Sequence, residues 1–212
     1  MKIKDDFIKK LLKRVDLENK KILEVGCGDG FRTYQFSKTK GIQIIAIDPD
    51  IERIALAKSK YGRKNIIYII SRAEKLPFKT KRFDIVIFTL SLHHIKLPKK
   101  ALQETRRVLK NKGLVVIIEP GLKGTIFQAE IMFDCLDGDE RKKKVKIQKL
   151  IMGNLHLKDT QKFLGKTEWQ FNSLTDFKKN TLPKKNIPKL KRFLDINDYK
   201  LWGERKINIF RK

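Results

Sequence analysis

Short apolar runs recur through the first 120 positions of the chain, and polar or glycine-containing turns separate them. The runs are Ile22–Val25, Ile42–Ile47, Ile66–Ile70, Phe83–Phe88 and Leu114–Ile118. Runs this short and this continuously apolar are typical of strands that are buried on both faces. When such strands alternate with helices, they form a parallel sheet that is covered on both sides. The pattern therefore predicts a doubly wound α/β unit over residues 1–120.

Apolar residues at helical spacing predict the helices of this unit. The first is expected to begin after Asp5, which can cap it, and its apolar positions continue to Val15. Further helices are expected over 31–37, from the capping residue Asp50 to residue 60, and over 98–109.

The pattern after residue 120 is less regular. Helices are expected over 125–136, 139–152 and 159–164, and Gly165 is expected to end the last one. Two later helix starts are indicated by the capping-box spacing of Ser173 and Asp176 and by Pro188, which suits a first turn.

A single domain is predicted for residues 1–212, because no repeat or low-complexity linker divides the chain. We expect a cofactor-binding core over about 15–135 and a closing strand over about 203–212. The stretch of about 137–198 between them is expected to form a variable, substrate-facing cap.

The composition adds a strong positive charge. Lysine and arginine number 50 against 24 acidic residues, so the net charge is +26. The excess is spread along the chain, about +15 in residues 1–120 and about +11 in the remainder, so no basic arm is predicted. This charge fits an anionic partner such as RNA, and it equally fits the lysine-rich codon usage of an AT-rich genome.

Composition also excludes several classes of protein. Two cysteines, Cys27 and Cys135, are too few for a disulfide scaffold, and no Cys/His cluster has zinc-site spacing, so no metal is expected. No apolar run is long enough to span a membrane. The first residues carry two acids where a signal peptide needs an apolar segment. We therefore expect a cytoplasmic protein without membrane insertion.

The clearest candidate site is the turn Gly26-Cys27-Gly28-Asp29-Gly30 after the first apolar run. Ligands of open α/β sheets bind beyond the carboxyl ends of the strands, and glycines let the backbone approach them closely. Asp48 ends the next run, where a carboxylate can accept from both hydroxyls of a ribose. A dinucleotide site needs a small residue at the position of Phe31, so the spacing disfavours that class.

The turn resembles motif I of the class I S-adenosylmethionine-dependent methyltransferases, with Glu24 two residues before the first glycine and Asp48 at the acidic ribose position. Later segments resemble the same family, particularly its ubiquinone/menaquinone-methyltransferase-like (type 11) branch. These segments are Arg72–Phe78, Phe83–Phe88 with Leu92-His93-His94, Arg107–Gly113 and Glu119-Pro120. The resemblance covers roughly residues 15–120. It implies a Rossmann-like, mostly parallel sheet of seven strands, S-adenosyl-L-methionine as cofactor and S-adenosyl-L-homocysteine as product.

The resemblance also implies a set of cofactor-binding residues, namely Glu24, Gly26, Cys27, Gly28, Gly30, Asp48, Pro49, Arg72, Ala73, Glu74 and Thr89. One of them departs from the family pattern. Arg72 stands where the family often has an aspartate that accepts from the adenine amino group, and a guanidinium cannot accept. Backbone groups around Ala73 or the carboxylate of Glu74 are expected to take over this contact.

Methyl transfer from a sulfonium requires an acceptor that is positioned, desolvated and in some cases deprotonated. His93 and His94 are the candidates for proton transfer, because imidazoles titrate near neutral pH and these two follow a strand. The same dipeptide can instead shape the loop around the methionine moiety. The Asn/Asp-Pro-Pro-aromatic motif of adenine-amino methyltransferases is replaced by Thr89-Leu90-Ser91-Leu92.

Three functions stay open. The leading one is transfer to a small molecule selected by the cap, with Phe163, Trp169, Phe171 and Phe177 either as walls or as ordinary core. The second is an RNA (tRNA) methyltransferase that binds phosphates through Arg141–Lys144, Lys178-Lys179, Lys184-Lys185 and Lys191-Arg192. The third is a non-catalytic cofactor-binding subunit. The acceptor atom and the oligomeric state are not predicted.

Overall fold

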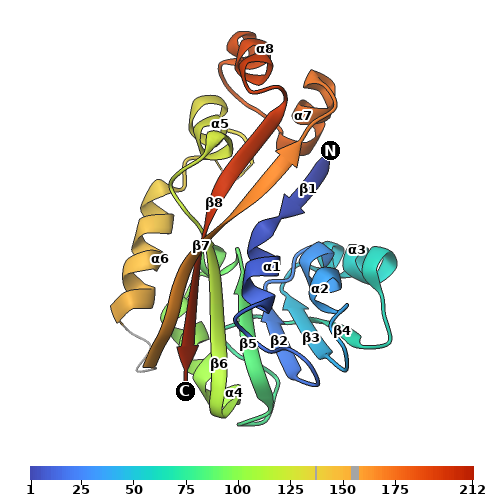
Figure 1. Cartoon of the computed structure of the whole chain (residues 1–212), viewed down its shortest axis with the longest axis vertical. Helices are drawn as coiled ribbons and strands as arrows, with labels where there is room; N and C mark the ends of the chain where they lie inside the picture. The colour runs from blue at the N-terminus through green and yellow to red at the C-terminus, as the bar shows by residue number, and fades with distance from the viewer. Residues whose placement is uncertain (137, 154–157) are drawn as a thin grey trace.

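The computed structural model describes residues 1–136, 138–153 and 158–212, and its described strands form one sheet with the order β1-β7-β8-β6-β5-β2-β3-β4 (Figure 1). The strands are Lys2–Asp5 (β1), Lys21–Val25 (β2), Gln43–Asp48 (β3), Ile66–Ile70 (β4), Phe83–Thr89 (β5), Leu109–Pro120 (β6), Lys158–Gln170 (β7) and Lys200–Arg211 (β8). The helices are Asp6–Leu12 (α1), Phe31–Phe36 (α2), Ile51–Tyr61 (α3), Pro98–Val108 (α4), Thr125–Phe133 (α5), Arg141–Gly153 (α6), Leu174–Thr181 (α7) and Ile187–Ile196 (α8), with a 3₁₀ turn at Leu92–His94 (η1). None of these helices is long and apolar enough to cross a membrane.

The five predicted apolar runs form the parallel half of the sheet, in the order β6-β5-β2-β3-β4. The chain winds outward from β2 through β3 to β4, and then returns to the other side of β2 as β5. The connections after β2 and β5 therefore leave in opposite directions and open a crevice at the carboxyl ends of the strands. The doubly wound α/β prediction is confirmed.

The other half of the sheet is antiparallel, and it corrects one expectation. Residues 159–164, expected as a helix, lie in β7, which pairs with both β8 and β1. Phe163 and Thr167 turn inward there, while Lys162 and Lys166 are exposed, so the strand alternates with a period of two. Gly165 lets the strand pass α1 closely, since a Cβ at this position would lie 2.5 Å from the Cβ of Phe7. The sheet has eight described strands instead of seven, and the additional one is β1.

Asp5 does not cap α1 with its side chain, contrary to expectation. Its buried carboxylate instead accepts from Arg32 Nε at 3.0 Å and from the hydroxyl of Thr167 at 2.5 Å. Asp5 therefore fastens β1 to β7 and to α2, the helix that follows the glycine turn.

Buried apolar residues form three clusters. One lies between the sheet and α1, α2 and α3, and a second lies on the opposite face beneath α4 and α6. The third joins α5, α7 and α8 around the ends of β7 and β8, at the end of the molecule drawn uppermost in Figure 1. Phe171 and Phe177 are fully buried in this third cluster, and Trp169 packs against it. These aromatic residues are core.

Candidate functional site

The glycine turn connects β2 to α2 at the crevice. Gly26 has φ +74°, and a Cβ there would lie 2.4 Å from the Cβ of Ser91, so no side chain fits between this turn and the loop after β5. Gly28 also has positive φ (+55°), yet a Cβ at that position would lie 3.7 Å from its nearest neighbour, an atom of Arg53. The turn is thus packed tightly at its start and is open at its middle.

Asp48 ties the glycine turn to the end of β3. Its Oδ2 accepts from the backbone N–H of Gly28 at 2.9 Å, and its Oδ1 accepts from that of Asp50 at 3.0 Å. Asp50 then caps α3, as predicted, by accepting from the N–H groups of Glu52 and Arg53. Each oxygen of Asp48 keeps a lone pair for a further donor.

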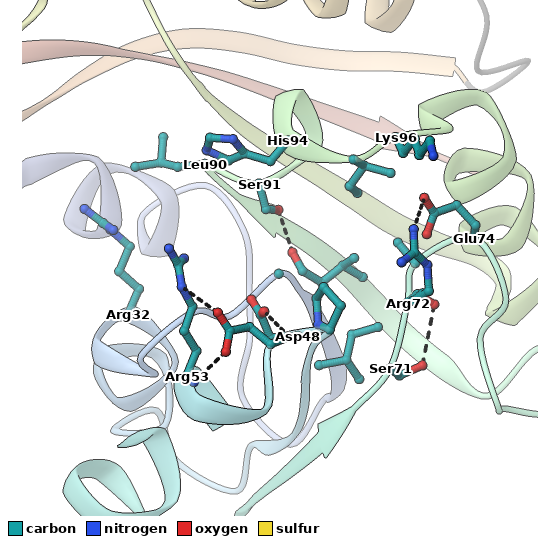
Figure 2. A pocket seen from close by; sticks show the side chains of 17 residues that line it. Arg32, Asp48, Arg53, Ser71, Arg72, Glu74, Leu90, Ser91, His94 and Lys96 are labelled. Atoms are coloured by element: carbon teal, nitrogen blue, oxygen red, sulfur yellow. Dashed lines mark hydrogen bonds and ion pairs between the residues drawn. The ribbon is translucent and has the colours of Figure 1, made fainter. Parts of the chain in front are cut away.

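A cavity of about 720 Å³ lies between this turn, the end of β3 and the loops after β4 and β5 (Figure 2). It is lined by Val25, Gly26, Arg32, Ile47, Asp48, Pro49, Asp50, Arg53, Ser71, Arg72, Ala73, Glu74, Leu90, Ser91, His94, Ile95 and Lys96. In Figure 2, Arg32, Leu90 and His94 lie toward one side of the cavity, and Ser71, Arg72 and Glu74 lie toward the other. Phe163, Trp169, Phe171 and Phe177, considered as walls, do not line it.

The predicted site residues divide into two groups. Those that line the cavity are Gly26, Asp48, Pro49, Arg72, Ala73, Glu74 and His94. Those that lie outside its lining are Glu24, Cys27, Gly28, Gly30, Thr89 and His93. The sequence did not predict Ser71 and Ser91, among other lining residues. Ser71 directly follows one predicted strand and Ser91 comes shortly after another, and ligands of this fold bind at these strand ends.

The segment after β4 lies along the second side of the cavity. The Arg72 side chain is mostly exposed, and its Nη2 lies 3.7 Å from Glu74 Oε1. The Glu74 side chain is only 12% exposed, and the same oxygen accepts from the N–H of Leu97 at 3.4 Å. Arg72 therefore leans toward the solvent, while Ala73 and Glu74 form the wall.

Glu24 lies buried behind the glycine turn. One oxygen accepts from the Thr33 hydroxyl at 2.6 Å, whereas its Oε1 and the hydroxyl of Thr89 are buried without a hydrogen-bond partner among the described residues. Burial raises the pKa of Glu24 to about 7. Burial likewise raises the pKa of the Cys27 thiol far above its ordinary value, so this thiol stays protonated.

The two histidines of η1 have different environments. His93 is buried, and its Nδ1 lies 2.6 Å from Glu119 Oε2. The His94 side chain is 44% exposed and lines the cavity, and the two rings are tilted by 40° to each other with centroids 3.9 Å apart. His94 can reach a bound molecule, and His93 supports it from behind.

Known proteins resemble this chain over the segments that form the cavity. Residues 23–117, which include the glycine turn, Asp48, the segment after β4 and the histidine pair, match the family model described as "Methyltransferase domain". The demethylmenaquinone methyltransferase of Chlorobaculum tepidum is 33% identical over 113 residues, which are 53% of this chain and 46% of that protein. The resemblance to the class I S-adenosylmethionine-dependent methyltransferases that the sequence shows is confirmed over residues 23–117.

Solved methyltransferase structures share the fold over nearly the whole chain. A putative methyltransferase from Bacillus halodurans has a TM-score of 0.66 at 18% identity and covers 98% of this chain and 99% of its own. A SAM-dependent methyltransferase from Aquifex aeolicus has a TM-score of 0.59 at 20% identity, with 93% and 88% covered. The chain spans about half the length of the curated relatives it matches. S-Adenosylmethionine is the cofactor of the family domain, and the type 11 branch named from the sequence is confirmed.

Proposed function

We propose that this chain transfers the methyl group of S-adenosylmethionine to a small-molecule acceptor. The observation that carries the proposal is Asp48, which lines the cavity at the end of β3 and is fixed there by the glycine turn. A cavity of about 720 Å³ is of the size that small-molecule sites have. The relatives named demethylmenaquinone methyltransferase support a small, quinone-like acceptor.

The cavity residues fit the cofactor in charge and in shape. Asp48 offers two carboxylate oxygens to the ribose hydroxyls, and the backbone around Gly28 is open, so a ligand can approach it. Ala73 and Glu74 wall the side on which the adenine would lie, and the Glu74 carboxylate can accept from its amino group. Arg72 has no part in this scheme.

The reaction is an in-line displacement. A lone pair of the acceptor forms a bond to the methyl carbon while the bond from carbon to sulfur breaks, and sulfur keeps the pair as the neutral thioether of S-adenosylhomocysteine. The acceptor's proton leaves to solvent or to a neighbouring base. The protein holds the two molecules in line and excludes water. Arg32, Leu90 and His94, on the side away from Glu74, are the groups placed to contact the acceptor.

A methyl-partition assay tests the proposal. The full chain is incubated with methyl-tritiated S-adenosylmethionine and an extract of its own organism, and the label is counted in RNA, protein, lipid and small-metabolite fractions. Label in metabolites or lipid, strongly reduced with the Asp48→Ala variant, is expected. Label confined to RNA would instead establish the RNA methyltransferase. Cofactor binding without label in any fraction would favour the non-catalytic subunit.

A further inference from the structure

Three side chains of metal-ligand type meet beside the cavity. His93 and His94 lie in η1, and Glu140 directly precedes α6. The ligand atoms of the three residues all lie within 4.8 Å of one another. His93 and Glu140 are buried. We propose that these three residues bind a divalent transition-metal ion.

The polar atoms of His93 and Glu140 face each other without a hydrogen bond between them. His93 Nδ1 donates to Glu119 Oε2 at 2.6 Å, and the other Glu119 oxygen accepts from the N–H of Leu92 at 3.0 Å. In the neutral tautomer that carries its proton on Nδ1, the Nε2 of His93 is an acceptor that lies 3.7 Å from Glu140 Oε2. That oxygen is buried and has no hydrogen-bond partner among the described residues. An acceptor facing a partnerless carboxylate oxygen is unfavourable unless a positive group lies between them.

The distances favour a metal ion over a proton as that group. His93 Nε2 and His94 Nδ1 lie 3.7 and 3.9 Å from Glu140 Oε2, too far for hydrogen bonds. Ligand atoms around a tetrahedral ion with bonds of about 2.1 Å are about 3.4 Å apart. The two pairs with Glu140 therefore need to contract by only a few tenths of an ångström, and the pair of histidine nitrogens lies within 4.8 Å.

The surroundings resemble the outer shell of a metal site. A carboxylate that accepts from the second nitrogen of a ligating histidine fixes its tautomer, and Glu119 does this for His93. Lys143 Nζ contacts the other oxygen of Glu140 at 2.5 Å and orients that carboxylate. Two imidazoles and one carboxylate suit Zn²⁺ or Fe²⁺, whereas Mg²⁺ prefers oxygen ligands alone.

Three protein ligands leave one coordination position open. Because His94 also lines the cavity, that position can be reached from the acceptor side. This use of the ion rests on the proposed methyl transfer: an acceptor hydroxyl bound there would lose its proton more readily, which would make the acceptor a stronger nucleophile toward the methyl group. The histidines then act as ligands and not as the base.

Metal binding to the full chain tests the proposal directly. The protein is stripped with a chelator and titrated with Zn²⁺ in a calorimeter, and Co²⁺ absorption reports the coordination. One Zn²⁺ per chain is expected, with affinity at least tenfold weaker in Glu140→Gln and in His94→Ala. Asp139→Asn, which removes the same charge from an exposed neighbour of Glu140, should bind Zn²⁺ like the wild type.

Absence of stoichiometric Zn²⁺ in the wild type, equal affinity in Glu140→Gln, or Mg²⁺ bound as tightly as Zn²⁺ would each overturn the metal site. S-Adenosylhomocysteine binding is measured on the same samples. Zn²⁺ bound without the nucleoside would support the metal site and refute the proposed function, so the two failures are distinguishable.

Discussion

At the scale of single residues, Asp48 carries the cofactor hypothesis, because it joins two loops and also faces the cavity. Asp48→Ala should weaken S-adenosylhomocysteine binding at least about tenfold, since it removes a charged acceptor for the ribose. Asp29→Ala is the matched control: it lies in the same turn, it removes an equal charge, and its side chain does not line the cavity. Calorimetric titration of both variants measures the difference, and equal binding to the two would refute the assignment of Asp48.

Glu24 gives a second residue-scale prediction. The pKa of Glu24 is about 7 in the folded protein, against 4.5 ordinarily. Between these two pH values the folded protein therefore keeps a proton on Glu24 that the unfolded chain releases. Its stabilising contribution is therefore complete below about pH 4.5 and is lost as the pH rises through about 7, a loss of roughly 3 kcal/mol. Glu24→Gln keeps an oxygen for Thr33 but cannot ionise, so it should be more stable than the wild type at pH 8 and similar at pH 4.5.

Urea unfolding of the wild type and Glu24→Gln across this pH range measures the effect. Glu18→Gln, at an exposed position, should follow the wild type throughout. A constant difference between the wild type and Glu24→Gln at all pH values would show that Glu24 stays ionised in the folded protein.

At the scale of elements, β7 is the segment that most departs from expectation. Gly165→Ala should destabilise the fold by at least about 2 kcal/mol, because its Cβ would meet the backbone and Cβ of Phe7 in α1. Leu164→Thr, at an exposed neighbouring position of the strand, should change the free energy of unfolding by less than about 0.5 kcal/mol. Urea denaturation of both variants is the measurement, and similar stabilities would contradict the packing of β7 on α1.

The parallel strands could be predicted and β7 could not, for a physical reason. Buried parallel strands are apolar on both faces, so the residues of Ile42–Ile47 alone are enough to predict a strand there. β7 is held by its pairing with β8 and β1, and its inward positions include Gly165 and Thr167, which carry no apolar pattern. Gly165 has two meanings in sequence, a helix end or a close approach, and only the position of α1 decides between them.

The site shows the same division. Motifs located Asp48, Ala73 and Glu74, because the family's spacing fixes them on loops at one edge of the sheet. The expectation of no metal rested on local spacing of ligands, which cannot detect Glu140 because it lies far along the chain from His94 and meets it only through the placement of α6 against η1. The spacing of residues along the sequence cannot predict a cluster that forms only through tertiary contacts.

At the scale of the whole molecule, the charge of +26 acts on every ligand that approaches. S-Adenosylmethionine carries a net positive charge at neutral pH, because its sulfonium and ammonium exceed its single carboxylate. S-Adenosylhomocysteine lacks the sulfonium and is neutral overall. RNA is strongly negative. Salt screens long-range charge. Added salt should therefore weaken the repulsion of S-adenosylmethionine and the attraction of RNA, and it should not affect S-adenosylhomocysteine.

Raising the salt from about 50 to about 200 mM should tighten S-adenosylmethionine binding slightly, by no more than about threefold, and should leave S-adenosylhomocysteine unchanged. RNA binding through several phosphate contacts should weaken at least about tenfold over the same range. Titrations of all three ligands at the two salt concentrations measure these responses. If methyl transfer to the true acceptor rises or holds with salt, the acceptor is not recognised through phosphates. If transfer falls as steeply as RNA binding does, the basic surface takes part in catalysis and the small-molecule proposal is wrong.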